Sequence, residues 1–286
     1  MKLQTFTTAH ECLSKVESFL LKNEAVNNLP LGILYSLTNA KSSYKPQIDP
    51  FFAAVEEEDI VLVMMITSPH RLIVCGEKTH PRLASALQLS VRHLTNKNVK
   101  VTSIIGIKDI ASQFAEIWSR KSGCSCIVMM DQSIYRLRHV NPIKYSSGRF
   151  RVATQEDCSL IAQWMLAFSE SLSERLKPED AQRMSENAIR KSTIFLWDNN
   201  GPVSMANKTR PTKNGAVVNF VYTPPEYQRK GYATSCVASL SQHLLDSGYQ
   251  FCTLYTDLSN PISNRIYMNI GYQPIEDSIV YQIADN

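Results

Sequence analysis

Residues 217–234 read VVNFVYTPPEYQRKGYAT, and this stretch decides which fold we expect. Its β-branched and aromatic opening predicts a buried strand, which Pro224 and Pro225 end because proline cannot donate to a sheet ladder. After Ala233, apolar residues recur at helical spacing, and Gly248 stands where a left-handed residue would end the helix. The stretch therefore predicts a strand, a tight loop and a helix in direct succession.

A loop that leads into a helix presents backbone N–H groups that have no partner within the helix. They point to the positive end of the helix dipole, which attracts a phosphate. Gly231 lets a bulky anion approach the backbone, Ala233 keeps the next turn small, and Arg229 and Lys230 add positive charge. From these residues we expect the loop to bind a pyrophosphate.

Two motifs in this half of the chain resemble those of a known family. The segment Gln228–Ala233, QRKGYA, is similar to the pattern Gln/Arg-x-x-Gly-x-Gly/Ala of the GNAT superfamily of acetyl-CoA-dependent N-acyltransferases. Downstream, residues 260–267 (NPISNRIY) followed by Gly271-Tyr272 resemble the family's Asn-x-x-Ala-x-x-x-Tyr element, with Ser263 in place of the alanine. The resemblance implies a GNAT fold in the C-terminal half.

The resemblance also implies site residues. In the family the loop holds the pyrophosphate of coenzyme A, the preceding strand pairs with the pantetheine arm, and an asparagine at the next helix reaches the cofactor. A tyrosine on that helix, here Tyr267, protonates the departing thiolate. Carried over to this sequence, the cofactor-binding residues are Val221, Tyr222, Thr223, Gln228, Arg229, Lys230, Gly231, Tyr232, Ala233, Thr234 and Asn260.

The general base cannot be identified from the resemblance. The family's glutamate positions on the fourth and fifth strands correspond to Val217 and Tyr255, and neither is a carboxylate. Glu226, Asp257 or an ordered water could take the proton instead. The site residues also have plainer interpretations, since Tyr267 could be a core tyrosine and Asn260 a helix cap.

The chain has 286 residues, more than one domain usually contains, so we expect two. A polar segment with proline and glycine at 141–148 suggests a division into 1–145 and 146–286. Periodicity in the first half predicts helices at 11–21, 29–39, 81–95 and 109–121, and strands at 51–55, 60–66, 71–75, 99–105 and 126–130. Both halves are thus α/β with a mixed sheet.

The order of the predicted elements in the first half echoes that in the second. The first half is therefore either a degenerate GNAT-like repeat or an unrelated α/β domain that covers the substrate side. Where a phosphate loop would be expected stands Gly76-Glu77-Lys78-Thr79-His80-Pro81-Arg82, which lacks the motif. We expect the first half not to bind the cofactor.

Composition narrows the partners. The net charge of +4 arises from 30 basic and 26 acidic residues without a long basic run, which suits a small anionic ligand better than a nucleic acid. Seven cysteines without a ligand cluster indicate reduced thiols and no metal site. The sequence shows neither a signal peptide nor an apolar run that could span a membrane, so we expect a soluble, cytoplasmic protein.

The function that follows is an N-acetyltransferase that moves acetyl from acetyl-CoA to a primary amine of a small molecule or peptide by direct attack. One alternative is an N-acyltransferase that uses longer acyl groups. Another is a coenzyme A-binding sensor or regulatory module that has lost catalysis. The acceptor and the oligomeric state cannot be inferred, because specificity resides in loops such as 169–178 and in the first half.

Overall fold

The computed structural model describes residues 1–39, 49–67, 71–170 and 175–284, so part of the acceptor loop predicted at 169–178 lies outside the described residues. The described chain divides into two compact units. The first contains Met1–Ile134, Asp257–Ser259 and the C-terminal segment from Ile275; the second contains Tyr135–Thr256 and Asn260–Pro274. The division expected from the sequence, into 1–145 and 146–286, did not include the return of the final strand to the first unit.

The first unit is a mixed sheet covered by helices on both faces. Strands β2 to β4 form the predicted antiparallel meander, and β4 then pairs with β5 in parallel. The elements in order are β1 (Lys2–Phe6), α1 (Ala9–Leu21), α2 (Asn28–Thr38), β2 (Phe51–Glu56), β3 (Ile60–Thr67), β4 (Arg71–Gly76), α3 (Leu83–Asn96), β5 (Ser103–Ile107), α4 (Lys108–Ser122) and β6 (Ser125–Leu137).

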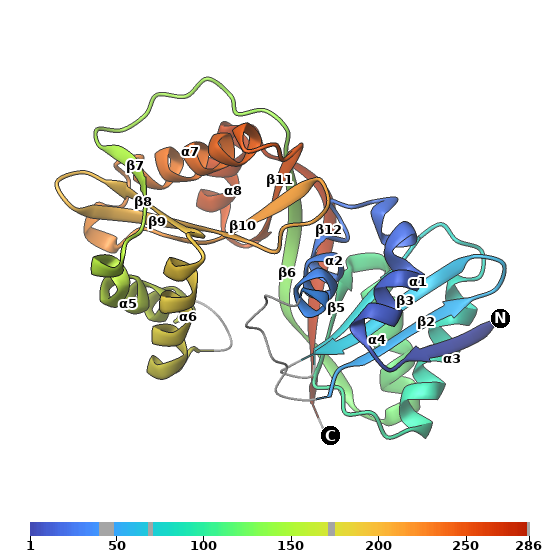
Figure 1. Cartoon of the computed structure of the whole chain (residues 1–286). Helices are drawn as coiled ribbons and strands as arrows, with labels where there is room; N and C mark the ends of the chain where they lie inside the picture. The colour runs from blue at the N-terminus through green and yellow to red at the C-terminus, as the bar shows by residue number, and fades with distance from the viewer. Residues whose placement is uncertain (40–48, 68–70, 171–174, 285–286) are drawn as a thin grey trace. The chain divides into compact units, whose positions relative to one another are not determined.

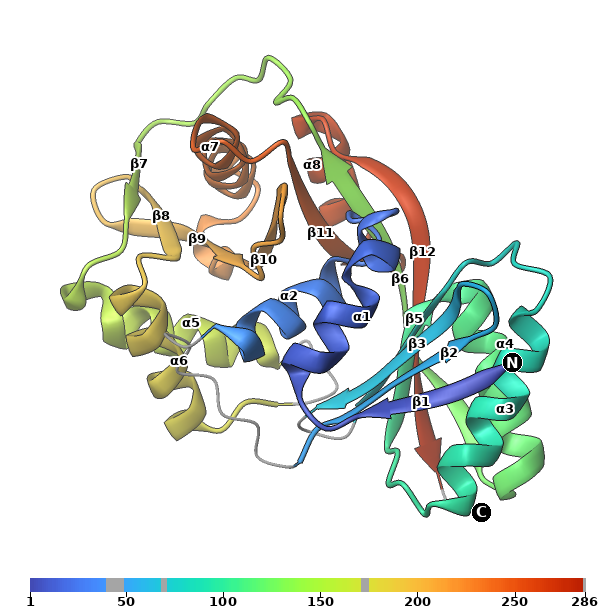
Figure 2. The same ribbon diagram turned by 45° about the vertical axis from the view of Figure 1, so that its right-hand side comes forward.

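Alternation along the strands explains the layers of the first unit. In β2, Ala53 and Val55 pack with α3 and α4, whereas Phe52 and Ala54 pack with α1 and α2. Successive side chains of a strand point to opposite faces, so a strand that is apolar throughout must be covered on both sides. Figure 2 shows the two helix pairs on opposite faces of this sheet.

The second unit has the same layers. Helices α7 and α8 cover one face of its sheet and α5 and α6 cover the other (Figure 1). Its elements are β7 (Arg149–Val152), α5 (Cys158–Ser169), α6 (Pro178–Arg190), β8 (Ile194–Asp198), β9 (Pro202–Thr209), β10 (Gly215–Tyr222), α7 (Tyr232–Asp246), β11 (Phe251–Asp257) and α8 (Pro261–Ile270), with short 3₁₀ turns at Gln155–Asp157 and Pro225–Tyr227. The last strand of the chain, β12 (Gln273–Ala284), belongs for most of its length to the first unit.

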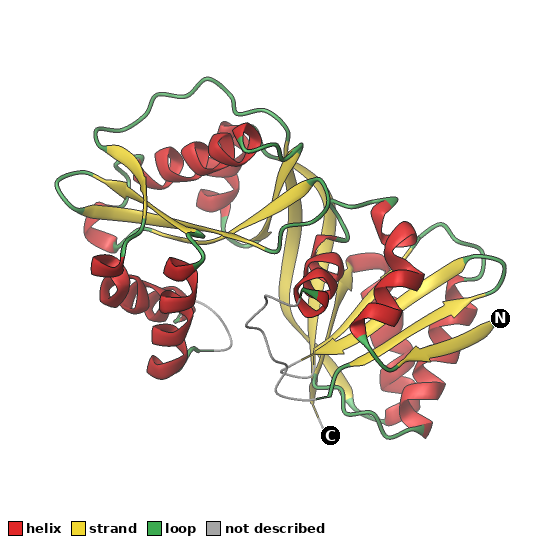
Figure 3. Cartoon of the chain, in the orientation of Figure 1, coloured by secondary structure: helices red, strands yellow, loops and turns green. Residues whose placement is uncertain are grey.

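The order strand, two helices, three-stranded meander, helix, strand, helix, strand occurs twice (Figure 3). The strand orders correspond as well, β1-β2-β3-β4-β5 in one unit and β7-β8-β9-β10-β11 in the other. The last strand of the chain is paired outside its own half, since β12 pairs with β5 of the first unit. The repeated order expected from the sequence is therefore present.

Two local expectations need correction. Strand β1 was not predicted, because its five residues KLQTF carry only one buried side chain, Phe6, and the strand lies at the edge of the sheet. The strand expected at 99–105 instead occupies Ser103–Ile107. Buried Val101 lies in the turn before it and contributes to the same core, so its apolar character extended the predicted strand too far.

A network centred on Arg151 ties β7 to the rest of the second unit. Its guanidinium donates to Asp198 Oδ2 at 2.7 Å and to both carboxylate oxygens of Asp157 at 2.7 and 2.9 Å. Asp157 also accepts from the Thr154 N–H at 2.7 Å. Hydrogen bonds from Arg151 hold the pKa of Asp157 and that of Asp198 below the usual 3.8.

We expect Arg151→Met to lower the free energy of unfolding by about 2–4 kcal/mol at pH 7, because two mostly buried carboxylates lose their partner. Since both pKa values are depressed in the fold, this stabilisation is present above about pH 3.8 and is lost as the pH falls through the folded-state values. Urea denaturation at pH 7 and pH 3 measures it. Arg183→Met is the control, because Arg183 forms only an exposed i,i+3 pair; equal effects of the two variants would contradict the assignment.

Candidate functional site

Strands β10 and β11 begin as neighbours and then separate. Their parallel register covers only Gly215–Val217 against Phe251–Thr253, although β10 continues to Tyr222 and β11 to Asp257. Beyond these pairs, the facing backbone groups of the two strands are not matched to each other. An extended, amide-bearing ligand arm can pair with such groups as an added strand does.

A bulge in β10 accompanies the separation. The register between β10 and β9 shifts between Asn219 and Tyr222, and Phe220 adopts a left-handed backbone with φ of 47°. A bulge bends its strand and increases the local twist, and such bulges are frequent beside active sites. The Phe220 ring packs on Phe168 of α5 at a centroid distance of 5.3 Å, which anchors the bulge to the helical layer.

The loop after β10 has the geometry expected for binding an anion. Arg229 has φ of 61° and Gly231 has φ of 80°, so two left-handed residues flank Lys230 just before α7. Gly231 is the N-cap of α7 and has no side chain that could accept a hydrogen bond from the first N–H groups of the helix. Its carbonyl accepts the Ser235 N–H at 3.0 Å. Backbone N–H groups gathered in this way form a nest for anions.

Side chains around the loop fix its shape. Gln228 Nε2 donates to the Thr223 carbonyl at 3.1 Å, which closes the turn. Lys230 Nζ donates to the Glu226 carbonyl at 3.0 Å and lies over the Tyr227 ring. Arg229 and Gly231 are exposed. The loop is therefore held from within and open on its outer side.

A segment far away in the sequence also clips the loop. Ser146 Oγ donates to the Lys230 carbonyl at 2.8 Å, and the Ser146 N–H donates to Ser235 Oγ at 2.9 Å. A Cβ added to Gly231 would lie 2.7 Å from Ser146 Oγ, so any larger residue would displace this clip, and the φ of 80° at this position also favours glycine. The expected linker 141–148 thus contains part of the support of the site, which no local sequence signal indicated.

Helix α8 holds the second motif. Asn260 is exposed and caps α8, accepting the Ser263 N–H at 3.1 Å, so its role as a helix cap is present. Thr256 Oγ1 of β11 donates to Asn264 Oδ1 at 2.7 Å, which joins the helix to the separating strand. Tyr267, two turns beyond Asn260, packs against the core between α7 and the sheet.

The phenol of Tyr267 is held neutral. Burial raises its pKa to about 12, and its ring meets the edge of the buried Tyr272 at 6.0 Å. At neutral pH a phenol in this state carries its proton and can donate it, whereas it cannot serve as a base. The side chain is thus suited to the role of a proton donor and also contributes to packing.

The residues predicted to contact the pantetheine arm, 221–223, pack to different sides of β10. Val221 packs toward α7, while the Tyr222 ring lies 6.0 Å from Trp164 of α5. Thr223 Oγ1 donates to Ser204 Oγ at 2.9 Å. Tyr232 is buried and its hydroxyl accepts from Asn199 Nδ2 at 2.8 Å, so only its backbone faces the loop. Ala233 and Thr234 are half-buried in the first turn of α7.

Of the residues considered for the base, none is distinguished by the structure. Glu226 is exposed in the turn after β10. The Asp257 carboxylate accepts from the N–H and the hydroxyl of Ser259 at 2.8 and 2.6 Å. Within the described residues, no group of three or more His, Cys, Asp and Glu could hold a metal ion.

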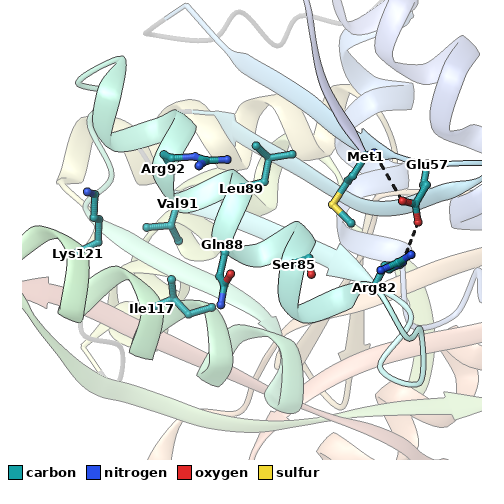
Figure 4. Close-up of a pocket in the computed structure, with 10 residues that line it drawn as sticks. All are labelled: Met1, Glu57, Arg82, Ser85, Gln88, Leu89, Val91, Arg92, Ile117 and Lys121. Atoms are coloured by element: carbon teal, nitrogen blue, oxygen red, sulfur yellow. Dashed lines mark ion pairs between the residues drawn. The ribbon is translucent and has the colours of Figure 1, made fainter.

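The corresponding strands of the first unit do not open. There β4 and β5 pair from Arg71–Ser103 to Val74–Gly106, close to the end of both strands, and the β3–β4 register is uninterrupted. A pocket in this unit lies over α3 and α4, where Glu57 is paired with the N-terminal amine at 3.6 Å and with Arg82 at 3.0 Å (Figure 4). None of the predicted site residues lines it.

Comparison with known proteins identifies the fold. The sequence model of the family described as "FR47-like protein" matches residues 200–280, which include both motifs. The chain has the GNAT fold. No curated protein matches the sequence. In the part of the chain that the structure describes, no helix is both long and apolar enough to cross a membrane.

Solved GNAT structures resemble the whole chain. An acetyltransferase of the GNAT family from Colwellia psychrerythraea has a TM-score of 0.61 and 13% identity over 100% of both chains. A GCN5-related N-acetyltransferase from Sphaerobacter thermophilus has a TM-score of 0.64 and 10% identity over 98% of this chain and 94% of its own. A tandem GNAT protein from the clavulanic acid biosynthesis pathway has a TM-score of 0.59 and 12% identity over 99% and 98%.

We expect Ser146→Ala to loosen the phosphate-type loop, because it removes the hydrogen bond to the Lys230 carbonyl. Loss of one such bond lowers the free energy of unfolding by about 1 kcal/mol. Hydrogen exchange of the amides at 230–234 should become faster in this variant. Ser147→Ala is the matched control, since Ser147 contributes only its carbonyl, to Trp197 Nε1 at 3.0 Å; equal exchange rates in the two variants would show that the clip is unimportant.

Proposed function

We propose that the chain is an N-acyltransferase that moves acetyl from acetyl-CoA to a primary amine. The observation that carries the proposal is the conjunction, in one unit, of the separated strands β10 and β11 with the glycine-capped start of α7 at Gly231. The first can take the pantetheine arm and the second a diphosphate. The FR47-like match over 200–280 supports the same assignment.

The reaction follows from these positions. A neutral amine nitrogen attacks the thioester carbonyl carbon, and the oxygen of that carbonyl becomes negatively charged. Backbone N–H groups of β10 near Val221 are the candidate donors to that oxygen. The C–S bond then breaks, the thiolate takes the phenol proton of Tyr267, and the amine loses a proton to a base or to water. The phenolate of Tyr267 regains a proton from water before the next turnover. The products are the N-acyl amine and coenzyme A.

The state of Tyr267 fits this role. A thiol has a pKa of about 8.5 in water. Burial raises the pKa of Tyr267 to about 12, and burial beside this phenol would also raise the pKa of the coenzyme A thiol. Both pKa values therefore rise, so the difference between them stays smaller than if only the pKa of the phenol rose. A smaller difference lowers the free energy needed to move the proton from the phenol to the thiolate. Because the phenol stays neutral below about pH 11, its deprotonation would not limit turnover in the usual range.

One observation favours a second function, a coenzyme A-binding module without catalysis. Positions 217 and 255, which correspond to the glutamate positions of the family, are valine and tyrosine. Such a module would bind coenzyme A and release no thiol with any amine. The length of the acyl group is likewise open to test, because a longer chain would bind with the same diphosphate contacts.

We expect Gly231→Glu to weaken coenzyme A binding by at least about 100-fold, because a carboxylate would enter the anion site and the Cβ would strike Ser146. Isothermal titration calorimetry measures the affinity. Gly248→Glu is the control: Gly248 also has a positive φ, 98°, but nothing lies within 4 Å of its added Cβ at the other end of α7. Unaltered affinity in Gly231→Glu would place the diphosphate elsewhere.

We expect Tyr267→Phe to bind coenzyme A as the wild type does and to lower kcat about 100-fold, because the thiolate then leaves without its proton donor. Thiol release from acetyl-CoA with a panel of amines measures turnover. Tyr249→Phe, a partly buried tyrosine on the same core, is the matched control. Wild-type turnover in Tyr267→Phe would remove this residue from the mechanism, whereas tight binding with no turnover in the wild type would favour the binding module.

A further inference from the structure

Arg210 is a partly exposed cation whose Nε lies buried in the fold. It follows β9 directly, in a left-handed backbone with φ of 40°, and its Nε is buried without a hydrogen-bond partner. Among the described residues, none accepts a hydrogen bond from its guanidinium or forms an ion pair with it. Burial lowers the pKa of the Arg210 guanidinium, and the hydroxyl of Tyr255 is the group that opposes this shift.

Such an arrangement is costly for the protein alone. A desolvated guanidinium needs an anion or several acceptors, and leaving it unpaired destabilises the fold. The hairpin that carries it is nevertheless held firmly: the Thr212 N–H donates to the Gly215 carbonyl at 2.8 Å, and the Gln250 N–H donates to the Asn214 carbonyl at 2.7 Å. The side chain is therefore positioned by a fixed turn rather than by contacts of its own charge.

Strand pairing places Arg210 close to the point where β10 and β11 separate, because it follows Thr209, which pairs with Val217 of β10, and Val217 pairs in turn with Thr253 of β11. Tyr255 lies two residues beyond Thr253, the last residue of β11 that pairs with β10, and it is on the same face of the strand as Thr253. Thr253 Oγ1 is buried and has no hydrogen-bond partner in the structure. Cys252 and Leu254 pack toward α7, so Thr253 and Tyr255 point to the opposite face.

We propose that Arg210 binds a carboxylate of the acceptor, which makes the acceptor a small amino acid or related amino-carboxylate. This inference rests on the proposed N-acyltransferase function and names its substrate class. A planar guanidinium recognises a carboxylate through two parallel hydrogen bonds, and an anion supplied by the substrate would give an acceptor to the buried Nε, which otherwise has none. The amine of the same molecule would then be held toward the separated strands.

The test compares acceptors that differ only in the carboxylate. Thiol release from acetyl-CoA is followed with amino acids such as glycine, alanine and glutamine and with their amides, and aminomethylphosphonate distinguishes a phosphonate from a carboxylate. The wild type should use the best amino acid with a kcat/KM about 100-fold above that of its amide. Arg210→Met should remove this preference and leave the coenzyme A affinity unchanged. Lys213→Met, an exposed cation in the same hairpin, should retain the preference.

Two further measurements keep the inference separate from the proposed function. Arg210→Met should melt no lower than the wild type, because it removes a charged side chain whose buried Nε has no partner; a marked loss of stability would show that the guanidinium has a structural partner. A thermal-shift titration with the same amino acids should stabilise the wild type and not Arg210→Met, whether or not turnover occurs. The carboxylate site would be overturned if the amides bind or react as well as the acids, or if the phosphonate is preferred. Failure of the wild type to bind coenzyme A would overturn the proposed function alone.

Discussion

The separation of β10 from β11 is the constraint on which the candidate site depends. Two strands that start in parallel register must part within a few residues, and this requires one of them to bend. The left-handed Phe220 supplies the bend, and its ring is held by Phe168 of α5. The loop after β10 then leads directly to the start of α7, so the same bulge affects both the opening and the position of the turn that contains Gly231.

The first unit has the same order of elements, but its two corresponding strands do not separate. Its β4 follows β3 without a register shift and stays paired with β5 as far as Gly106. The turn before α3 ends at Arg82 with φ of −97°, so it lacks the left-handed cap that Gly231 provides before α7. One topology is thus used twice, and the difference between the halves lies in a few backbone conformations rather than in the order of strands and helices.

Local signals in the sequence were enough for most elements and for the loop. Gly248 has positive φ, as its place after α7 predicted, and the meander in each half follows from short apolar runs between turns. Features that depend on distant partners were not accessible. Ser146 meets Lys230 across the fold, β12 joins β5, and nothing in the residues around Phe220 favours a left-handed conformation for a bulky aromatic side chain.

The distribution of backbone strain is consistent with a functional origin for these features. Among the described residues other than glycine, positive φ occurs at Asn98, Ser192 and Asn200, small polar residues of the kind common in turns, and at Arg210, Phe220 and Arg229. The bulky three belong to the hairpin before β10, to β10 itself and to the loop after it. A left-handed backbone at such residues costs free energy, and it persists only where the surrounding structure enforces it. Concentration of that cost along one strand and its two flanking turns, together with an uncompensated guanidinium, is understandable if the strained segment holds ligands that supply the missing interactions.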